Sequence, residues 1–243
     1  MFKVTAAHSS LPSQAKINSP CRAWSARQLI AVAALLVALA AASLLVDTAI
    51  ARMAKERGFP GELRRLIRLS EFFGWGGTVA LVIVAAAMLD PRGWRAPLPL
   101  ATAAYGSGIL ADGAKLLVAR LRPIAATLDR GALGTFVAWL PLFHKEELGR
   151  SYGYALQSFP SAHAATAAGL AVGLATLYPR GRWLFAICAV LASLQRIEAE
   201  AHFLSDVLCG AAIGCLIGAA TGYYLAPGRE PGPTSGAGGL ELE

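Results

Sequence analysis

Three groups of polar residues stand at the ends of apolar runs in this chain of 243 residues. They are Lys115 and Arg122, then Ser161 and His163, and finally Arg196, His202 and Asp206. An ionisable group is costly to keep in a membrane-spanning segment, so its presence there suggests a function. Cationic side chains can hold an anion, an imidazole can act as a nucleophile or exchange protons, and a carboxylate can orient an imidazole. These residue types therefore predict a site for chemistry on an anionic substrate.

The spacing within the first two groups favours helices that aim these side chains in one direction. Lys115 and Arg122 are two helical turns apart, and so point the same way until Pro123 ends the helix. Pro160 suits the first position of a helix, which places Ser161 and the amides after it at a helix N-terminus. Since helix N-termini bind anions readily, this segment is a candidate anion site.

The third group predicts a paired histidine and carboxylate. His202 and Asp206 are four residues apart and would share one helix face, so the carboxylate can accept the imidazole N–H and fix its tautomer. A single helix over 183–225 would be about 65 Å long, twice the thickness of a bilayer core. We therefore expect a break between Arg196 and His202, which lets Arg196 reach the same site.

The elements that position these groups are long apolar segments. Only 15% of the residues are charged, against about 25% in soluble domains, which argues against a soluble globule, a disordered chain and a nucleic-acid-binding protein. Six apolar runs are present, at Leu29–Val46, Phe72–Leu89, Leu98–Val118, Ala162–Tyr178, Trp183–Leu194 and Phe203–Leu225. They predict an all-α, polytopic membrane protein that forms a bundle of six transmembrane helices. Because successive spans alternate in direction, the polar groups would all meet at one membrane face.

Some segments allow more than one interpretation. The first run could instead be the core of a cleaved signal peptide, although it is longer than most. Residues 52–70 suit either a helix in the headgroup layer or a solvated connecting helix. The connection 119–159 contains an apolar piece, 134–143, which is too short to span and would be re-entrant or interfacial. Small residues that favour close helix packing recur every fourth position, at Ser161, Ala165, Gly169 and Gly173, and at Gly210, Gly214, Gly218 and Gly222.

We expect one membrane domain with a tail at each end. A polar, basic N-terminal tail would cover 1–27, the membrane domain 28–226, and a disordered Gly- and Pro-rich tail 227–243. The four cysteines include no CxxC pair and three of them lie in apolar runs. Neither a disulfide framework nor a zinc site is therefore indicated.

The polar groups also form a signature of three motifs, Lys115-x6-Arg122-Pro123, Pro160-Ser161-Ala162-His163 and Arg196-x5-His202-x3-Asp206. In order and spacing these resemble the motifs of the type 2 phosphatidic acid phosphatase family, whose superfamily includes the vanadium-dependent haloperoxidases. The resemblance covers residues 28–226. The chain departs from the family pattern at Ala162, where glycine is usual, and at Gln195, where serine is common.

The resemblance implies a phosphate-binding role for one set of residues. Lys115, Arg122 and Arg196 would surround a phosphate and neutralise the charge on its oxygens. Ser161 and the amide near Ala162 would add hydrogen bonds. Because fixed cations would do this work, the resemblance implies no metal and no other cofactor.

The resemblance also implies a two-step mechanism. His202 would attack phosphorus in line and form a phosphohistidine, while Asp206 orients the ring and stabilises the imidazolium. His163 would protonate the leaving alkoxide and then activate water to hydrolyse the intermediate. The chain would thus be a phosphoric monoester hydrolase.

The expected function is an integral membrane lipid phosphatase that hydrolyses a phosphomonoester or diphosphate of a lipid. A lipid phosphotransferase using the same phosphohistidine, a vanadate-dependent haloperoxidase and a non-catalytic membrane protein are the alternatives. The partners would be the bilayer and a lipid phosphate, with no nucleic acid, and the sequence indicates no oligomeric state. The basic N-terminal tail favours an N-terminus on the inside and a site on the outside, whereas six Lys and Arg in 51–68 argue against that orientation. The resemblance implies a periplasmic or luminal site, so we expect a bacterial inner-membrane protein whose site faces the periplasm or the exterior.

Overall fold

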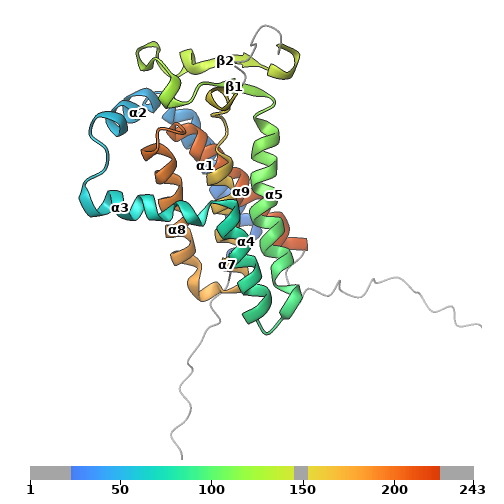
Figure 1. Ribbon diagram of the computed structural model, residues 1–243. Coiled ribbons are helices and arrows are strands. Elements are labelled where there is room, and N and C mark those ends of the chain that lie inside the picture. Colours follow the sequence, from blue (N-terminus) through green and yellow to red (C-terminus); the bar gives the residue numbers. More distant parts are fainter. Residues whose placement is uncertain (1–22, 145–152, 225–243) are drawn as a thin grey trace, which may run out of the picture.

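The computed structural model describes residues 23–144 and 153–224, and these are mostly helical (Figure 1). The long helices are α1 (Ala26–Ser43), α4 (Gly76–Leu89), α5 (Pro97–Ala114), α7 (Ala162–Leu177), α8 (Arg182–Glu198) and α9 (Leu204–Tyr224). The shorter helices are α2 (Asp47–Glu56) and α3 (Gly61–Leu69), and a 3-10 turn, η1 (Ser70–Phe73), joins α3 to α4. The predicted N-terminal tail lies outside the described residues up to residue 22, and the predicted tail 227–243 lies outside them entirely.

Each of the six apolar runs forms one long helix, but fewer helices qualify as membrane spans. Among the described residues, Ala26–Ser43 and Leu204–Gly222 are long and apolar enough to cross a bilayer. Gly61–Phe73 and Gly76–Leu89 meet these criteria only as a pair that is bent by 65°, the geometry of either a broken span or a re-entrant loop. α7 has 16 residues, or about 24 Å, which is shorter than a bilayer core of about 30 Å. The mainly helical fold is therefore confirmed, and the count of six spans is not.

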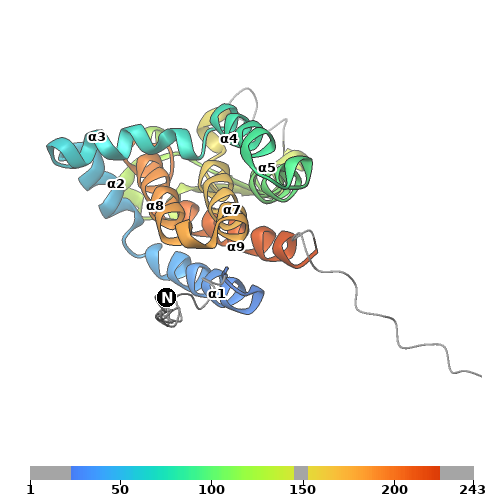
Figure 2. The ribbon, with the colours of Figure 1, turned by 90° about the horizontal axis from the view of Figure 1, so that it is seen from below.

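α7 is the central helix, and small residues explain how closely its neighbours approach. It packs against α5, α8 and α9, and α1 packs on the outside of α9 (Figures 1 and 2). A Cβ added to Gly214 would lie 2.5 Å from the Cβ of Ala168, and one added to Gly169 would overlap the Ala103 carbonyl oxygen. Only glycine lets the backbones come this close. Residues of both small-residue ladders therefore lie in helix interfaces.

The connection between α5 and α7 contains a small sheet at one end of the bundle (Figure 1). β1 (Val118–Arg120) pairs antiparallel with β2 (Phe136–Trp139), with Val118 opposite Trp139. Along β2 the partly buried and exposed side chains alternate, as they do in a strand with one covered face. The apolar piece 134–143 thus contains a strand, so the all-α prediction is wrong for this connection, and its predicted re-entrant or interfacial position stays a prediction.

α3 runs across the end of α8 and is anchored there by ion pairs (Figure 1). Arg64 and Arg68 both donate to the carboxylate of Glu198, at 2.7 and 2.9 Å. Ile67 of α3 is buried, whereas Leu66 is exposed. The anchored α3 in turn fixes η1, which follows it directly and lies beside the polar groups described next.

Candidate active site

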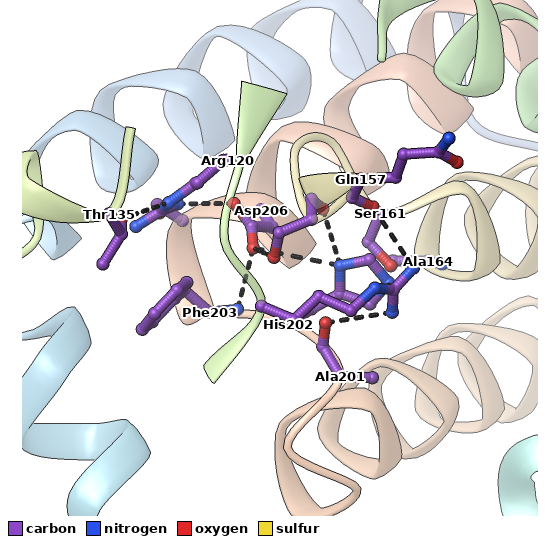
Figure 3. Close-up of polar contacts among 12 residues, drawn as sticks. Arg120, Thr135, Gln157, Ser161, Ala164, Ala201, His202, Phe203 and Asp206 are labelled. Carbon is purple, nitrogen blue, oxygen red and sulfur yellow. Dashed lines mark hydrogen bonds and ion pairs between the residues drawn. The ribbon is translucent and has the colours of Figure 1, made fainter. Parts of the chain in front are cut away.

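The polar groups predicted from the sequence gather at the end of the bundle that carries the small sheet (Figure 3). They come from the end of α5, the segment after β1, the start of α7, the last turn of α8, the loop between α8 and α9, and the first turn of α9. The predicted break between Arg196 and His202 is confirmed, since α8 ends at Glu198 and α9 begins at Leu204. Lys115 pairs with Asp112 at 2.7 Å, and its side chain is largely buried.

The backbone that leads from Lys115 to Arg122 leaves the helix and becomes extended. Lys115 is the C-cap of α5, and β1 follows it, so Lys115 and Arg122 are not two turns apart on one helix as predicted. Residues two apart in an extended chain project to the same side. Arg120 and Arg122 therefore both project toward the start of α9, where Arg120 contacts Asp206 in the first turn and Arg122 contacts His202 just before it.

The other two predicted helical placements also need correction. His202 precedes α9 and therefore does not share a helix face with Asp206. Pro160 stands before Ser161, the N-cap of α7, and not at the first helical position. The expected helix N-terminus at this segment is nevertheless present, because Ser161 itself begins α7.

The ring of His202 is buried and is held by one backbone carbonyl. Nδ1 lies 2.7 Å from the carbonyl oxygen of Ser158. Since a carbonyl only accepts hydrogen bonds, Nδ1 carries the proton and Nε2 keeps its lone pair. Nε2 lies 3.4 Å from Nη1 of Arg122, so the lone pair faces a guanidinium group. The Asp206 carboxylate is 3.8 Å from Nδ1, which is too far for the direct hydrogen bond predicted between them.

Asp206 is completely buried in the first turn of α9 and joins several segments there. It reaches back to accept from the backbone N–H of Phe203 at 2.8 Å, as the third residue of a capping box does. The same oxygen accepts from the hydroxyl of Ser158 at 2.6 Å, and the other accepts from Arg120. Asp206 therefore positions His202 through Ser158, whose carbonyl holds the ring.

Arg120 in β1 is a residue of this site that the sequence analysis missed. Its side chain is fully buried, and ion pairs join it to Asp206 and, at 2.8 Å, to Asp47 at the start of α2. The rings of Phe136 and Phe203 lie beside its guanidinium, with centres at 4.5 and 4.3 Å. Its remaining contacts are with the hydroxyls of Thr135 and Ser205. The signal that could have revealed it is the Arg-x-Arg alternation that ends at Arg122, once the segment is assigned as a strand.

Arg122 is held by groups that carry no net charge. It donates to the backbone carbonyls of Tyr154, Ala201 and Gln157, at 2.8, 3.1 and 3.2 Å. Its Cζ atom lies 3.7 Å from the centre of the Tyr154 ring. Because these partners are neutral, the positive charge of Arg122 remains available to an anion that binds beside Nε2 of His202.

The turn η1 contacts both His163 and Arg196. Nε2 of His163 lies 2.9 Å from the carbonyl oxygen of Glu71, so this nitrogen carries a proton and Nδ1 is left to exchange one. The Glu71 carboxylate accepts from Nη2 of Arg196 at 3.2 Å and from Gln195 at 3.3 Å. Nε of Arg196 is buried and finds no hydrogen-bond partner among the described residues. Since a buried donor without an acceptor is costly, this nitrogen suits an oxygen atom of a bound anion.

Ser161 links the start of α7 to α9. Its hydroxyl accepts from the Ala164 N–H at 3.4 Å, and its own N–H donates to the Asp206 carbonyl at 3.0 Å. The amides from Ala162 onward belong to the first helical turn, where N–H groups lack helical partners. A Cβ on Gly210 would overlap the Ser161 carbonyl oxygen. Glycine at this position of α9 therefore lets the N-terminus of α7 reach the site.

Burial of His202 has a consequence that can be measured in the unliganded protein. Loss of hydration lowers the pKa of His202 from its ordinary value of 6.5, and the charges of Arg122 and Lys115 act in the same direction, while Asp206 opposes them. We therefore expect the imidazole to stay neutral as the pH falls through 6.5 and to gain its proton only below it. Histidine-ring NMR, assigned with His202→Asn, measures the midpoint. A midpoint at or above 6.5 would contradict this.

Three comparisons with known proteins extend these observations. The PAP2 superfamily model matches residues 96–228, which include the polar groups of α5, α7, α8 and α9. Over 60 residues the chain is 40% identical to the lipid A 1-phosphatases of Rhizobium etli and Rhizobium johnstonii. That stretch covers 25% of this chain and spans only 26% and 25% of those two relatives.

A solved structure has a similar fold. It is the crystal structure of the first transmembrane PAP2 type phosphatidylglycerolphosphate phosphatase from Bacillus subtilis, and the TM-score is 0.50. The likeness covers 81% of this chain and 94% of that chain at 18% sequence identity. At that identity the likeness concerns the fold.

Proposed function

This chain belongs to the PAP2 superfamily, and on that premise we propose that it is a membrane lipid phosphatase that works through a phosphohistidine on His202. The observation that carries the proposal is the placement of the His202 ring. Its proton is on Nδ1, held by the Ser158 carbonyl, and its lone pair on Nε2 faces the guanidinium of Arg122. A neutral imidazole aimed at the place where a cation would hold a phosphate is a suitable nucleophile for phosphorus.

In this proposal the phosphate is bound by cations and amides around Nε2 of His202. Arg122 contributes a positive charge that its carbonyl partners leave uncompensated, and Arg196 contributes the buried Nε that lacks a partner among the described residues. Lys115 adds a third positive charge from the end of α5. Ser161 and the amide of Ala162 add the N-terminus of α7. Such preorganised charge stabilises the transition state of phosphoryl transfer.

The reaction then proceeds in two balanced steps. In the first, Nε2 of His202 forms a bond to phosphorus while the ester P–O bond breaks, and the leaving lipid alkoxide takes the Nδ1 proton of His163, which enters this step as an imidazolium. In the second, His163 removes a proton from water, the water oxygen bonds to phosphorus, and the P–N bond breaks. Inorganic phosphate leaves, and His202 returns to its neutral form.

The position of His163 depends on a glycine in the chain that follows η1. A Cβ on Gly74 would lie 2.8 Å from both Nε2 and the carbonyl oxygen of His163, and still closer to its Cδ2. The substitution Gly74→Ala must therefore displace the ring that we assign as acid and base. We expect kcat to fall by about 100-fold, because a displacement near 1 Å costs that much in positioned catalysis.

The matched control for this prediction is Gly76→Ala, since a Cβ there would lie 3.8 Å from the Tyr105 ring, an ordinary contact. Steady-state kinetics of both variants in lipid–detergent micelles make the comparison. Equal kcat values for Gly74→Ala and Gly76→Ala would contradict the role given to the position of His163.

We further propose that the site lies on the outer side of a bacterial inner membrane. Trp24, just before α1, packs edge-on against Trp183 at the start of α8, with ring centres 5.8 Å apart. Since α8 ends at the site, α1 begins at the opposite end of the bundle, next to the basic tail that favours the cytoplasmic side. Labelling of an Asp129→Cys variant by an impermeant thiol reagent on intact cells is expected, and labelling only after lysis would reverse the orientation.

The experiment that tests the proposed function is release of inorganic phosphate by the purified protein from a panel of lipid phosphates. The panel contains phosphatidic acid, phosphatidylglycerolphosphate, a polyprenyl diphosphate and lipid A with its 1-phosphate. The assay includes excess chelator, because the fixed cations are expected to replace a metal. Circular dichroism and gel filtration of each preparation confirm that it is folded.

We expect the wild type to hydrolyse at least one member of the panel, with one phosphate released for each lipid product, and His202→Asn to hydrolyse none. Transfer of the phosphate to a second lipid would identify a phosphotransferase instead. A folded wild type that turns over no lipid phosphate would contradict the proposed function.

A further inference from the structure

Asp47 lies at the start of α2, outside the part of the chain that the family model matches, yet it is buried against the site. We propose that Asp47 is a positioning residue for the reaction. It fixes Arg120, and through it Asp206 and His202, and it supplies a second buried negative charge that stabilises the charge formed on His202. This inference rests on the proposed function and assigns part of the site to the N-terminal third of the chain.

The contacts of Asp47 use both oxygens of its carboxylate. Oδ2 accepts from Nη2 of Arg120 at 2.8 Å and from the hydroxyl of Ser205. Oδ1 accepts from the backbone N–H of Ser205 at 3.0 Å. The side chain has no exposed surface. Asp47 therefore binds the first turn of α9, which carries Asp206, both directly and through Arg120.

Arg120 transmits this position to Asp206. One terminal nitrogen of its guanidinium donates to Asp47, and the other donates to Asp206 and to Ser205. The rings of Phe136 and Phe203 lie beside the planar group at 4.5 and 4.3 Å, and this packing restricts its movement. A planar fork held between two carboxylates sets the distance between them. The place of Asp206 is thus fixed from α2 as well as from α9.

The path continues from Asp206 to the ring. Asp206 accepts from the Ser158 hydroxyl at 2.6 Å, and the Ser158 carbonyl holds Nδ1 of His202 at 2.7 Å. Figure 3 shows Asp206 between Arg120 and His202. The chain of contacts from Asp47 to His202 is therefore continuous and consists of buried hydrogen bonds and ion pairs. Because these groups are buried away from water, their polar interactions are stronger than at the surface, and the loss of one side chain weakens the contacts of the others.

The charges of this set favour a positive imidazole. Asp47 and Asp206 are two carboxylates, and Arg120 is one guanidinium, so the set carries one negative charge in excess. A His202 ring that keeps its Nδ1 proton and forms a bond from Nε2 to phosphorus becomes positively charged, which cancels that excess. Because the surroundings are buried, the gain is larger than it would be in water. Removal of the Asp47 charge should therefore slow the formation of the phosphohistidine.

The test is Asp47→Asn, which keeps the shape of the side chain and removes its charge. We expect kcat, and the rate at which the phosphohistidine forms in rapid-quench experiments, to fall by about 10- to 100-fold, the scale found at metal sites when a hydrogen-bond partner that orients a functional histidine is lost. KM should change by less than about twofold, because Arg122, Arg196 and Lys115 still bind the phosphate. Asp47→Glu keeps the charge and should lose less of kcat than Asp47→Asn.

The matched control is Asp129→Asn. Asp129 also forms an ion pair with an arginine, Arg52, but its side chain is 80% exposed, and its kinetics should equal those of the wild type. If Asp47→Asn yields no folded protein, Asp47→Ser replaces it, since a smaller neutral side chain leaves room for water beside Arg120. The same loss of kcat is expected of it.

Two results would overturn the inference. One is a folded Asp47 variant with wild-type kcat and phosphorylation rate, which would leave Asp47 a purely structural role. The other is a fall in apparent kcat that disappears when the rate is divided by the concentration of folded protein, which active-site titration measures. In both cases the wild type would still release phosphate from lipid, so the proposed function would stand. A wild type without that activity would instead remove the premise.

Discussion

Replacing His202 with asparagine is expected to lower the rate of phosphate release by about 10⁴-fold or more, the scale seen when a nucleophile of a covalent mechanism is removed. Asparagine retains an N–H group that can donate to the Ser158 carbonyl, which now holds Nδ1 of the ring. It has no lone pair to attack phosphorus. The loss is therefore expected in kcat, and initial rates at saturating lipid phosphate measure it.

The His202→Asn protein should still bind the product. The groups proposed to hold phosphate, Arg122, Arg196 and Lys115, are all retained, so inorganic phosphate is expected to raise the melting temperature of the variant as it does that of the wild type. A folded variant that keeps more than about a hundredth of the wild-type rate would contradict the assignment of His202 as the nucleophile.

Replacing Arg120 with methionine is expected to destabilise the protein by about 3–5 kcal/mol, because removing one partner of a buried ion pair leaves an uncompensated charge. Here two carboxylates, Asp47 and Asp206, would lose the guanidinium that separates them. Their mutual repulsion adds to the loss of hydration. Denaturant titration in detergent micelles, followed by circular dichroism, measures the change in the free energy of unfolding.

The control for this prediction is Arg52→Met. Arg52 and Asp129 also form an ion pair, at 2.7 Å, but their side chains are 49% and 80% exposed. Exposed pairs contribute about 0–1 kcal/mol, so Arg52→Met should change little. The double variant Arg120→Met/Asp47→Asn should recover part of the stability lost in Arg120→Met, since it removes one of the opposing charges. Equal stability of Arg120→Met and Arg52→Met would show that the buried ion pairs contribute little.

The parts of this structure that the sequence predicts are those with a strong local pattern. Each apolar run forms a helix, and the limit on helix length correctly places a break between Arg196 and His202. The recurrence of small residues identifies faces that pack closely, as Gly214 against Ala168 shows. These features depend on the chemistry of neighbouring residues and on the thickness of a bilayer, which sequence reasoning handles well.

The parts that it misses depend on contacts between distant segments. The spacing of Lys115 and Arg122 predicts one helix across both residues. The chain instead forms β1 after Lys115, because β1 pairs with β2, a later segment of the connection between α5 and α7. The helical spacing draws attention to Arg122 alone, whereas the two-residue spacing of a strand also includes Arg120. The partner of Arg120, Asp47, is 73 residues away at the start of α2, and no local pattern signals its role. The predicted hydrogen bond between Asp206 and His202 is absent for a similar reason. The backbone carbonyl of Ser158, which comes from another segment, accepts from Nδ1 of His202 in place of the carboxylate.

The number of spans is a question of length rather than of pattern. The helix α7 has the apolar composition of a span, but its 16 residues cover only about 24 Å. α7 is surrounded by α5, α8 and α9, so its apolar character is explained by burial within the protein as well as by contact with lipid. Composition does not separate these two environments, because both favour the same residues.

The most direct test of the account is rapid-quench labelling of the wild-type protein with a lipid phosphate that carries ³²P in the scissile group. The account predicts a transient protein-bound label that is stable in alkali and labile in acid, as phosphoramidates of histidine are, and that peptide mapping places at His202. The label should form no more slowly than kcat and should be absent from His202→Asn. Turnover without any protein-bound label, or a label at another residue, would contradict the proposed mechanism.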